Sequence, residues 1–231
     1  MNSVIIGMGE VGASLYGVLS QAHKVTTKDL GKKVLPRRVD VLHVCTRWNS
    51  GFLSLVEHYA SLTEPNIIDI CSTVPPGTTE KLGSIACHST TRGLHPNLKE
   101  SLRTFTKHIG GPKAKELADY YAISGIKTQI HTRARTTELC HILSNSLYGV
   151  NILLADEMSK ICRNYGVDYM DLIEYNRTSN EGYRALGHDS KMRMLLTPPN
   201  GPIGGHCVTQ GAELLDKDKL TECSVIWRLR Q

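Results

Sequence analysis

The sequence predicts an α/β protein: a doubly wound parallel sheet at residues 1–130, followed by a small all-helical domain at residues 131–231. Three observations predict this fold class. The first half of the chain alternates short runs rich in valine and isoleucine with amphipathic segments. A glycine-rich turn follows the first of these runs. After about residue 130, apolar residues recur at steps of three and four, which is the period of a helix.

Four apolar runs predict the buried strands of the sheet. They are SVIIG (3–7), KVTTKD (24–29), DVLHVC (40–45) and NIIDICS (66–72). Amphipathic segments at residues 11–20 and 51–62 predict the connecting helices. Strands that alternate with helices in this way should run parallel, through right-handed connections. We expect a fifth strand at residues 91–94, just before His95.

The second half predicts helices only. One long helix is expected at residues 136–166 and a second at 168–178, with Asp168 as its N-cap. A weaker helical segment covers residues 180–196. An irregular loop rich in proline and glycine follows at residues 197–211. The apolar positions of the long helix are Leu139, Ile142, Leu143, Leu147, Val150, Leu154, Met158 and Ile161.

A dinucleotide-binding turn is predicted after the first strand. Gly7, Gly9 and Gly12 have G-x-G-x-x-G spacing between a strand and a helix, as in Rossmann-type sheets. In that motif the first glycine makes the turn, the second admits the pyrophosphate and the third lets the helix pack on the strand. Asp29 ends the next strand, where a carboxylate binds the ribose hydroxyls and favours NAD over NADP. A plain strand–helix turn with a surface aspartate is the alternative.

Composition limits the function classes. The chain of 231 residues is 40% hydrophobic and 21% charged, with a net charge of +5, and lacks interleaved basic and aromatic residues. We therefore expect a small-molecule substrate rather than nucleic acid, and no membrane partner, because no apolar run is long enough for a spanning helix. Seven cysteines without a Cys-x-x-Cys pair predict no metal site, no disulfide framework and a reducing, cytoplasmic location. The N-terminus does not resemble a secretory signal.

Four ordered motifs resemble the UDP-glucose/GDP-mannose dehydrogenase family. They are the glycine turn, STVPPGTT (72–79), NSLYGVNILLADEMSKIC (145–162) and GPIGGHCV (201–208). The resemblance implies an NAD-dependent oxidoreductase that acts on a CH–OH group of a nucleotide sugar. It implies that Cys207 is a nucleophile that forms a thiohemiacetal and then a thioester, and that the long helix makes a homodimer. Asn145 matches an asparagine of the family's helix and, one turn from His141, is expected to orient a carbonyl or hydroxyl of the substrate. The chain ends soon after Gly211, so we expect a truncated form that lacks the family's C-terminal nucleotide-binding domain.

Some positions depart from the family pattern. His141 occupies the position of the family's lysine, and Gly211 that of an aspartate. An imidazole at this position suits a single hydride transfer, as in hydroxyacid dehydrogenases, with His141 as the base and Cys207 only lining the site. Thr73, at a strand end, is expected to contact the nicotinamide ribose or to serve the turn. His95 is an acid–base candidate or a surface turn residue. A non-catalytic NAD-binding module remains a further alternative.

Overall fold

The computed structural model describes residues 1–31, 34–94, 96–198 and 206–215. The chain divides into two compact units, Met1–His141 and Ile142–Gln231. The boundary lies within a long helix, whereas the sequence placed it near residue 130.

In chain order the elements are β1 (Asn2–Ile6), α1 (Glu10–Leu19), β2 (Lys24–Lys28), β3 (Val41–Val44), α2 (Phe52–Thr63), β4 (Ile67–Ile70), η1 (Thr79–Leu82), β5 (Ala86–Ser89), α3 (Leu98–Thr104), β6 (Lys107–Gly110), α4 (Ala114–Ile123), β7 (Thr128–His131), α5 (Ala134–Asn164), α6 (Tyr169–Ala185), η2 (Asp189–Lys191) and α7 (His206–Glu213).

The first unit is built on one seven-stranded sheet with the order β2-β1-β3-β4-β5-β6-β7. Every neighbouring pair is parallel except β5 and β6, which pair antiparallel. The strand order reverses between β1 and β3, and such a switch point opens a crevice at the carboxyl ends of the strands. The predicted fold class, a Rossmann-type α/β sheet with a helical region after it, is confirmed.

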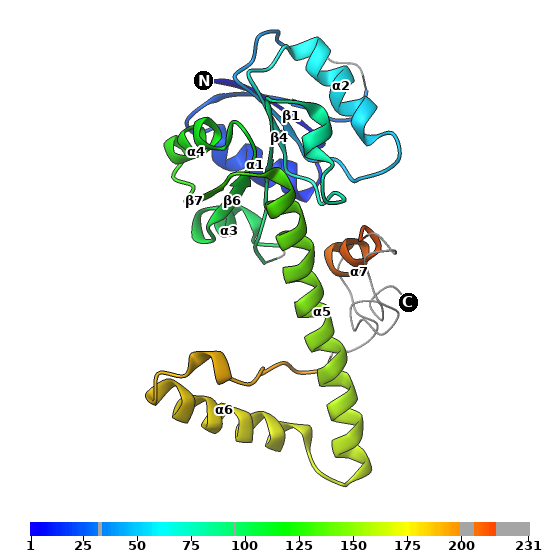
Figure 1. Cartoon of the computed structure of the whole chain (residues 1–231), viewed down its shortest axis with the longest axis vertical. Coiled ribbons are helices and arrows are strands. Elements are labelled where there is room, and N and C mark those ends of the chain that lie inside the picture. The colour runs from blue at the N-terminus through cyan, green and yellow to red at the C-terminus, as the bar shows by residue number, and fades with distance from the viewer. Residues whose placement is uncertain (32–33, 95, 199–205, 216–231) are drawn as a thin grey trace. The chain divides into compact units, whose positions relative to one another are not determined.

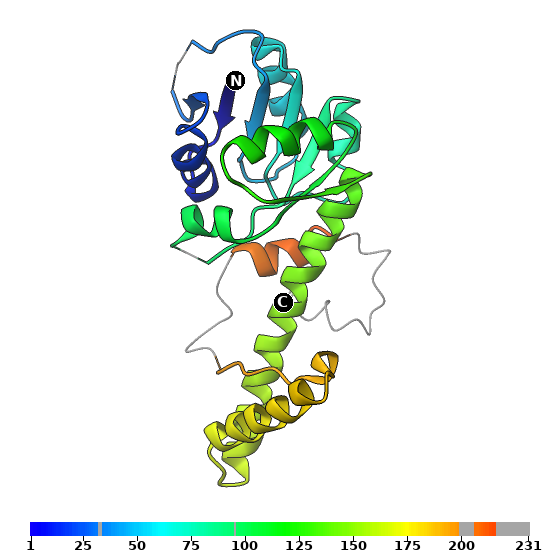
Figure 2. The ribbon, with the colours of Figure 1, turned by 90° about the vertical axis from the view of Figure 1, so that its left-hand side faces the viewer.

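Helices cover both faces of the sheet (Figure 1 and Figure 2). On one face, apolar side chains of α1, α3 and α4 pack against alternate strand residues such as Ile5 and Val41. On the other face, Phe52 and Val56 of α2 pack against the intervening residues, among them Leu42. The central strands β1, β3 and β4 therefore bury both of their faces, which explains their nearly continuous apolar runs.

The last three strands differ from the expectation. The fifth strand is β5 at Ala86–Ser89, and residues 91–94 form no strand. β6 and β7 have four residues each and contain polar side chains. A strand of four residues is too short to show a clear alternation of apolar and polar side chains. Its burial depends on the neighbouring strands and on the helix packed against it.

The second unit contains most of α5 together with α6, η2 and α7. Asp168 caps α6 as expected, since its side chain accepts a hydrogen bond from the N–H of Met170 at 2.9 Å. α6 continues to Ala185, and residues 186–196 form only the short turn η2, so the helix expected at 180–196 is wrong beyond Ala185. The side chain of Asn180 fixes this segment, because it donates to the carbonyl of Arg193 and accepts from its N–H.

Candidate dinucleotide and thiol site

The three glycines of the turn have different surroundings. Gly7 has φ +88°, and a Cβ there would lie 2.9 Å from Thr46 Cγ2 at the end of β3. A Cβ on Gly12 would lie 1.9 Å from the carbonyl oxygen of Gly7, whereas one on Gly9 would meet no atom within 4 Å. Gly7 and Gly12 therefore serve the tight turn and the close packing of α1. Gly9 leaves open space beside the N-terminus of α1, where N–H groups favour a phosphate.

Asp29 lies beside this turn. It follows β2 directly, is exposed, and its Oδ1 is 3.5 Å from the N–H of Met8. The neighbouring Lys28 directs its ammonium group to the carbonyl oxygens of Asp29 and Gly31, not to the carboxylate. The Asp29 carboxylate thus lies beside the glycine turn, at the carboxyl ends of the neighbouring strands β1 and β2.

The STVPPGTT segment is held by the first turns of α5. The side chain of Glu138 is buried and accepts hydrogen bonds from the N–H groups of Gly77 and Thr79, the latter at 2.8 Å. Gly77 has φ +92°, and a Cβ there would approach the guanidinium of Arg135 to 3.0 Å. These contacts fix the turn that follows β4. Thr73, half-buried at the carboxyl end of β4, precedes the turn at the same sheet edge as Gly7.

His141 and Asn145 lie one helical turn apart on α5 and are both half-buried. Burial and the positive charges of Arg92 and Lys107 lower the pKa of the His141 imidazole to about 4. His141 is therefore neutral at pH 7. An imidazole with so low a pKa is a weak general base at that pH.

Cys207 lies in the first turn of α7. The sequence predicted an irregular loop up to residue 211, but residues 206–213 are helical. Its side chain is outside the described part of the structure, and so is His95. α7 packs in the second unit through Val208 and Ala212, against Val150 and Leu153 of α5.

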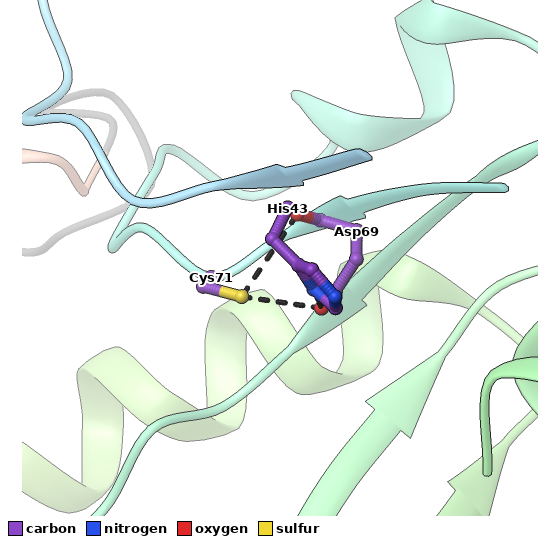
Figure 3. A group of neighbouring side chains, drawn as sticks. All are labelled: His43, Asp69 and Cys71. Carbon is purple, nitrogen blue, oxygen red and sulfur yellow. Dashed lines mark hydrogen bonds and ion pairs between the residues drawn. The ribbon is translucent and has the colours of Figure 1, made fainter. Parts of the chain in front are cut away.

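The sequence analysis missed a buried polar network in the sheet (Figure 3). His43 of β3 and Asp69 of β4 are register partners, and His43 Nδ1 lies 2.7 Å from Asp69 Oδ2. The same oxygen accepts hydrogen bonds from the thiol of Cys71, at 3.2 Å, and from the hydroxyl of Tyr121. His43 Nε2 lies 3.3 Å from the hydroxyl of Tyr120. One signal was available: His43 and Asp69 are each the single polar residue inside an apolar strand.

The network is charged. Burial opposes ionisation of Asp69, yet the hydrogen bond and the charge of His43 hold the pKa of the Asp69 carboxyl well below its usual range. Burial likewise opposes protonation of His43, but its neighbours Tyr120 and Asp69 raise the pKa of the imidazole well above its ordinary value. The hydrogen bond with Cys45 lowers the pKa of the Cys71 thiol to about 6, and the same contact raises the pKa of Cys45.

Sequence comparisons connect the chain with nucleotide-sugar dehydrogenases. Residues 135–222 match the central domain of the UDP-glucose/GDP-mannose dehydrogenase family. A UDP-N-acetyl-D-mannosamine dehydrogenase of Methanococcus vannielii is 31% identical over 157 residues, which are 64% of this chain and 34% of that protein. An NDP-N-acetyl-D-galactosaminuronic acid dehydrogenase of Ralstonia nicotianae is 32% identical over 124 residues, 52% of this chain and 26% of that protein. The chain thus spans about a third of the length of the curated relatives it matches.

Solved structures show the same fold. A UDP-D-ManNAc dehydrogenase from Pyrococcus horikoshii superimposes with a TM-score of 0.81 at 21% identity, over 100% of this chain and 67% of that one. No helix in the described part of the chain is both long and apolar enough to cross a membrane. The resemblance predicted from the four motifs is confirmed: residues 135–222 match the central domain of the UDP-glucose/GDP-mannose dehydrogenase family, and the chain is similar to nucleotide-sugar dehydrogenases.

Proposed function

We propose that this protein is an NAD-dependent oxidoreductase that oxidises a CH–OH group of a sugar or nucleotide sugar. The glycine turn at the switch point carries the proposal. Its two tight positions, Gly7 and Gly12, and its open position, Gly9, are those that a pyrophosphate on a helix N-terminus requires. A bound dinucleotide supplies a hydride acceptor. The residues present fit its pyrophosphate and ribose, with Thr73 near the nicotinamide end at the carboxyl edge of β4.

Asp29 supports NAD rather than NADP. Its carboxylate is exposed beside the turn and is free of an ion pair with Lys28, whose ammonium group bonds carbonyl oxygens. A carboxylate there accepts hydrogen bonds from both ribose hydroxyls and repels a 2′-phosphate.

We assign the covalent step to Cys207. Cys207 belongs by its backbone to the first turn of α7, and a helix N-terminus is a position that favours a thiolate. The thiolate would add to the aldehyde formed by a first hydride transfer and give a thiohemiacetal. A second hydride transfer would give a thioester, which water hydrolyses to the acid. Asn145 would orient the substrate oxygen. The low pKa of His141 favours this course over a single oxidation with His141 as the base.

Counting NADH separates the possible courses. The protein would be mixed with NAD and a panel of UDP-sugars, including UDP-N-acetyl-D-mannosamine, and NADH would be measured by absorbance. Two NADH per substrate in the wild type, and no acid product with Cys207→Ser, would support the proposal. Cys140→Ser is the matched control, because Cys140 is an exposed thiol of α5. One NADH per substrate, with Cys207→Ser fully active, would contradict the covalent step. NAD binding without NADH formation would contradict the enzyme.

We also propose a homodimer through α5. Exposed leucine and isoleucine side chains follow one another at steps of four, four, seven and seven, which places them on one face of the helix. They are Leu139, Leu143, Leu147, Leu154 and Ile161. An apolar stripe of this kind marks a protein–protein interface.

Light scattering of Leu147→Glu tests the dimer. Leu147 is 63% exposed, and a charge there should give a monomer. Tyr148→Glu is the control, since Tyr148 is 53% exposed and lies about 100° around the helix from Leu147, outside the stripe. A dimer that persists in Leu147→Glu, or is lost equally in both variants, would contradict the proposal.

We place the protein in the cytoplasm, because the described cysteines are free thiols, as in a reducing compartment.

A further inference from the structure

The buried network contains an unusual set of donor atoms for the interior of a parallel sheet. His43, Asp69 and Cys71 each offer one nitrogen, oxygen or sulfur ligand atom, and these three atoms lie within 4.8 Å of one another. The side chains of His43 and Asp69 are fully buried, and Cys71 is 6% exposed. Interior positions of a parallel sheet are ordinarily valine, isoleucine or leucine. Burying these polar and ionisable side chains costs free energy, and an interaction within the site must offset it.

The two carboxylate oxygens of Asp69 are unequally hydrogen-bonded. Three donors converge on Oδ2, from His43, Cys71 and Tyr121. Oδ1 is buried, and no hydrogen-bond partner for it occurs among the described residues. An unpaired buried carboxylate oxygen is unfavourable. A cation bound to the carboxylate would satisfy it.

A second thiol lies on the same face of the sheet. Cys45 follows β3 as Cys71 follows β4, and the N–H of Cys71 donates to the carbonyl of Val44 at 2.9 Å, which continues the strand register. The pKa of each of these two thiols depends on the other. His43 and Cys45 thus lie two residues apart on one strand, opposite Asp69 and Cys71 on the next. The compact set is one imidazole, one carboxylate and one thiol, those of His43, Asp69 and Cys71, and the register places Cys45 beside it.

We propose that His43, Asp69 and Cys71 bind one zinc ion inside the sheet, with Cys45, which follows the neighbouring strand on the same face, turning its thiol in as the fourth ligand. Zinc takes four nitrogen, oxygen or sulfur ligands at about 2.0–2.3 Å in a tetrahedron, so its ligand atoms lie about 3.3–3.8 Å apart. The observed separations of 2.7 Å (His43–Asp69) and 3.2 Å (Cys71–Asp69) need only a small expansion. This revises the expectation, drawn from cysteine spacing alone, that the chain binds no metal.

The charge of the site fits a dication. Two thiolates and a carboxylate carry three negative charges, which zinc reduces to one. Lys107 is buried, donates to the carbonyl of Thr90 at 3.2 Å, and exerts its positive charge on both Asp69 and Cys71. Zinc would replace the protons that the imidazole and the thiols carry, as metal binding to such ligands does.

Metal loading during synthesis tests the proposal, because a closed site takes up its ion while the chain folds. The full chain would be produced in medium supplemented with Co²⁺, and separately with Zn²⁺, and then purified with a chelator in the buffer. We expect about one ion per chain by elemental analysis. The cobalt form should show the intense near-ultraviolet absorption of a thiolate–cobalt bond together with tetrahedral visible bands.

Variants assign the ion to the network. Cys71→Ser and His43→Gln should reduce the metal content to background. Cys87→Ser is the matched control, since Cys87 is an equally buried thiol on the neighbouring strand. His131→Gln controls for binding at the half-exposed pair in which His108 Nδ1 lies 2.9 Å from His131 Nε2. Both controls should keep the ion.

Two outcomes would overturn the proposal: a wild type without zinc or cobalt above background, or metal that remains in both Cys71→Ser and His43→Gln. Circular dichroism would establish which variants are folded. If one ligand variant does not fold, the other and the wild-type metal content still decide. The test is independent of NAD turnover, so it separates this inference from the proposed enzyme activity.

Discussion

Replacement of Glu138 should destabilise the first unit strongly. The carboxylate is 1% exposed, and its two oxygens accept the N–H groups of Gly77 and Thr79, which are themselves buried. In Glu138→Ala both donors lose their partner. A buried donor left without a partner costs about 1–3 kcal/mol, so two donors cost about 2–6 kcal/mol. That is a large share of the about 5–15 kcal/mol that stabilises a typical domain.

Urea unfolding followed by circular dichroism measures this loss. Glu138→Gln should lose about half as much, because the amide oxygen still accepts one N–H while its NH₂ group faces the other. Glu157→Ala is the control, since Glu157 is an exposed carboxylate of the same helix, and it should change the free energy of unfolding by less than about 0.5 kcal/mol. A loss below about 1 kcal/mol in Glu138→Ala would refute the reasoning that these two N–H groups depend on the carboxylate.

Three further outcomes are expected. Gly12→Ala should abolish NAD binding and lower the thermal midpoint, since its Cβ would lie 1.9 Å from a carbonyl oxygen of the turn; calorimetric titration with unchanged affinity would contradict this. Asp168→Ala should lose about 1 kcal/mol in urea unfolding, as the removal of an N-cap does, and Asp168→Asn much less. In the metal-free protein, the His43–Asp69 pair should stabilise the fold most between about pH 3.9 and 6.5. Below that window the carboxylate, whose folded pKa is lowered, becomes protonated, and above it the imidazolium, whose folded pKa is raised, loses its proton. The difference in unfolding free energy between wild type and Asp69→Asn should therefore shrink on both sides, and a difference that is constant with pH would contradict the ion pair.

The sequence was sufficient where the signal is local. The runs of β1, β3 and β4 are rich in valine, leucine and isoleucine, and their burial on both faces follows from that composition. The glycine spacing located the turn at the switch point, and Asp168 located the start of α6. The period of α5 extended over enough turns to be unmistakable.

The rest depends on contacts between distant segments. The strand β6, with the sequence KHIG, is part of the sheet only because β5 and β7 flank it. The partners of Glu138 lie about sixty residues away in sequence, and no local pattern identifies them. The pairing of His43 with Asp69 required the strand order and register, which a single sequence does not provide. Once β3 and β4 are known to be neighbours, the polar residue inside each run predicts the contact.

The strand order also has a consequence for the kinetics of folding. Within the described sheet, β1 pairs with both β2 and β3, and each later strand pairs with the strand that precedes it in the chain. Most pairings therefore join strands that are consecutive in the chain, which keeps the loop-closure entropy of each pairing low for a parallel sheet. The β1–β3 pairing is the one that joins strands not consecutive in the chain, and Gly7 lies at this junction, with Thr46 and Cys45 as its neighbours. A bulkier residue at Gly7 should therefore slow refolding. The backbone turn proposed to bind a phosphate is also the place where β1 and β3 must pair for the sheet to form.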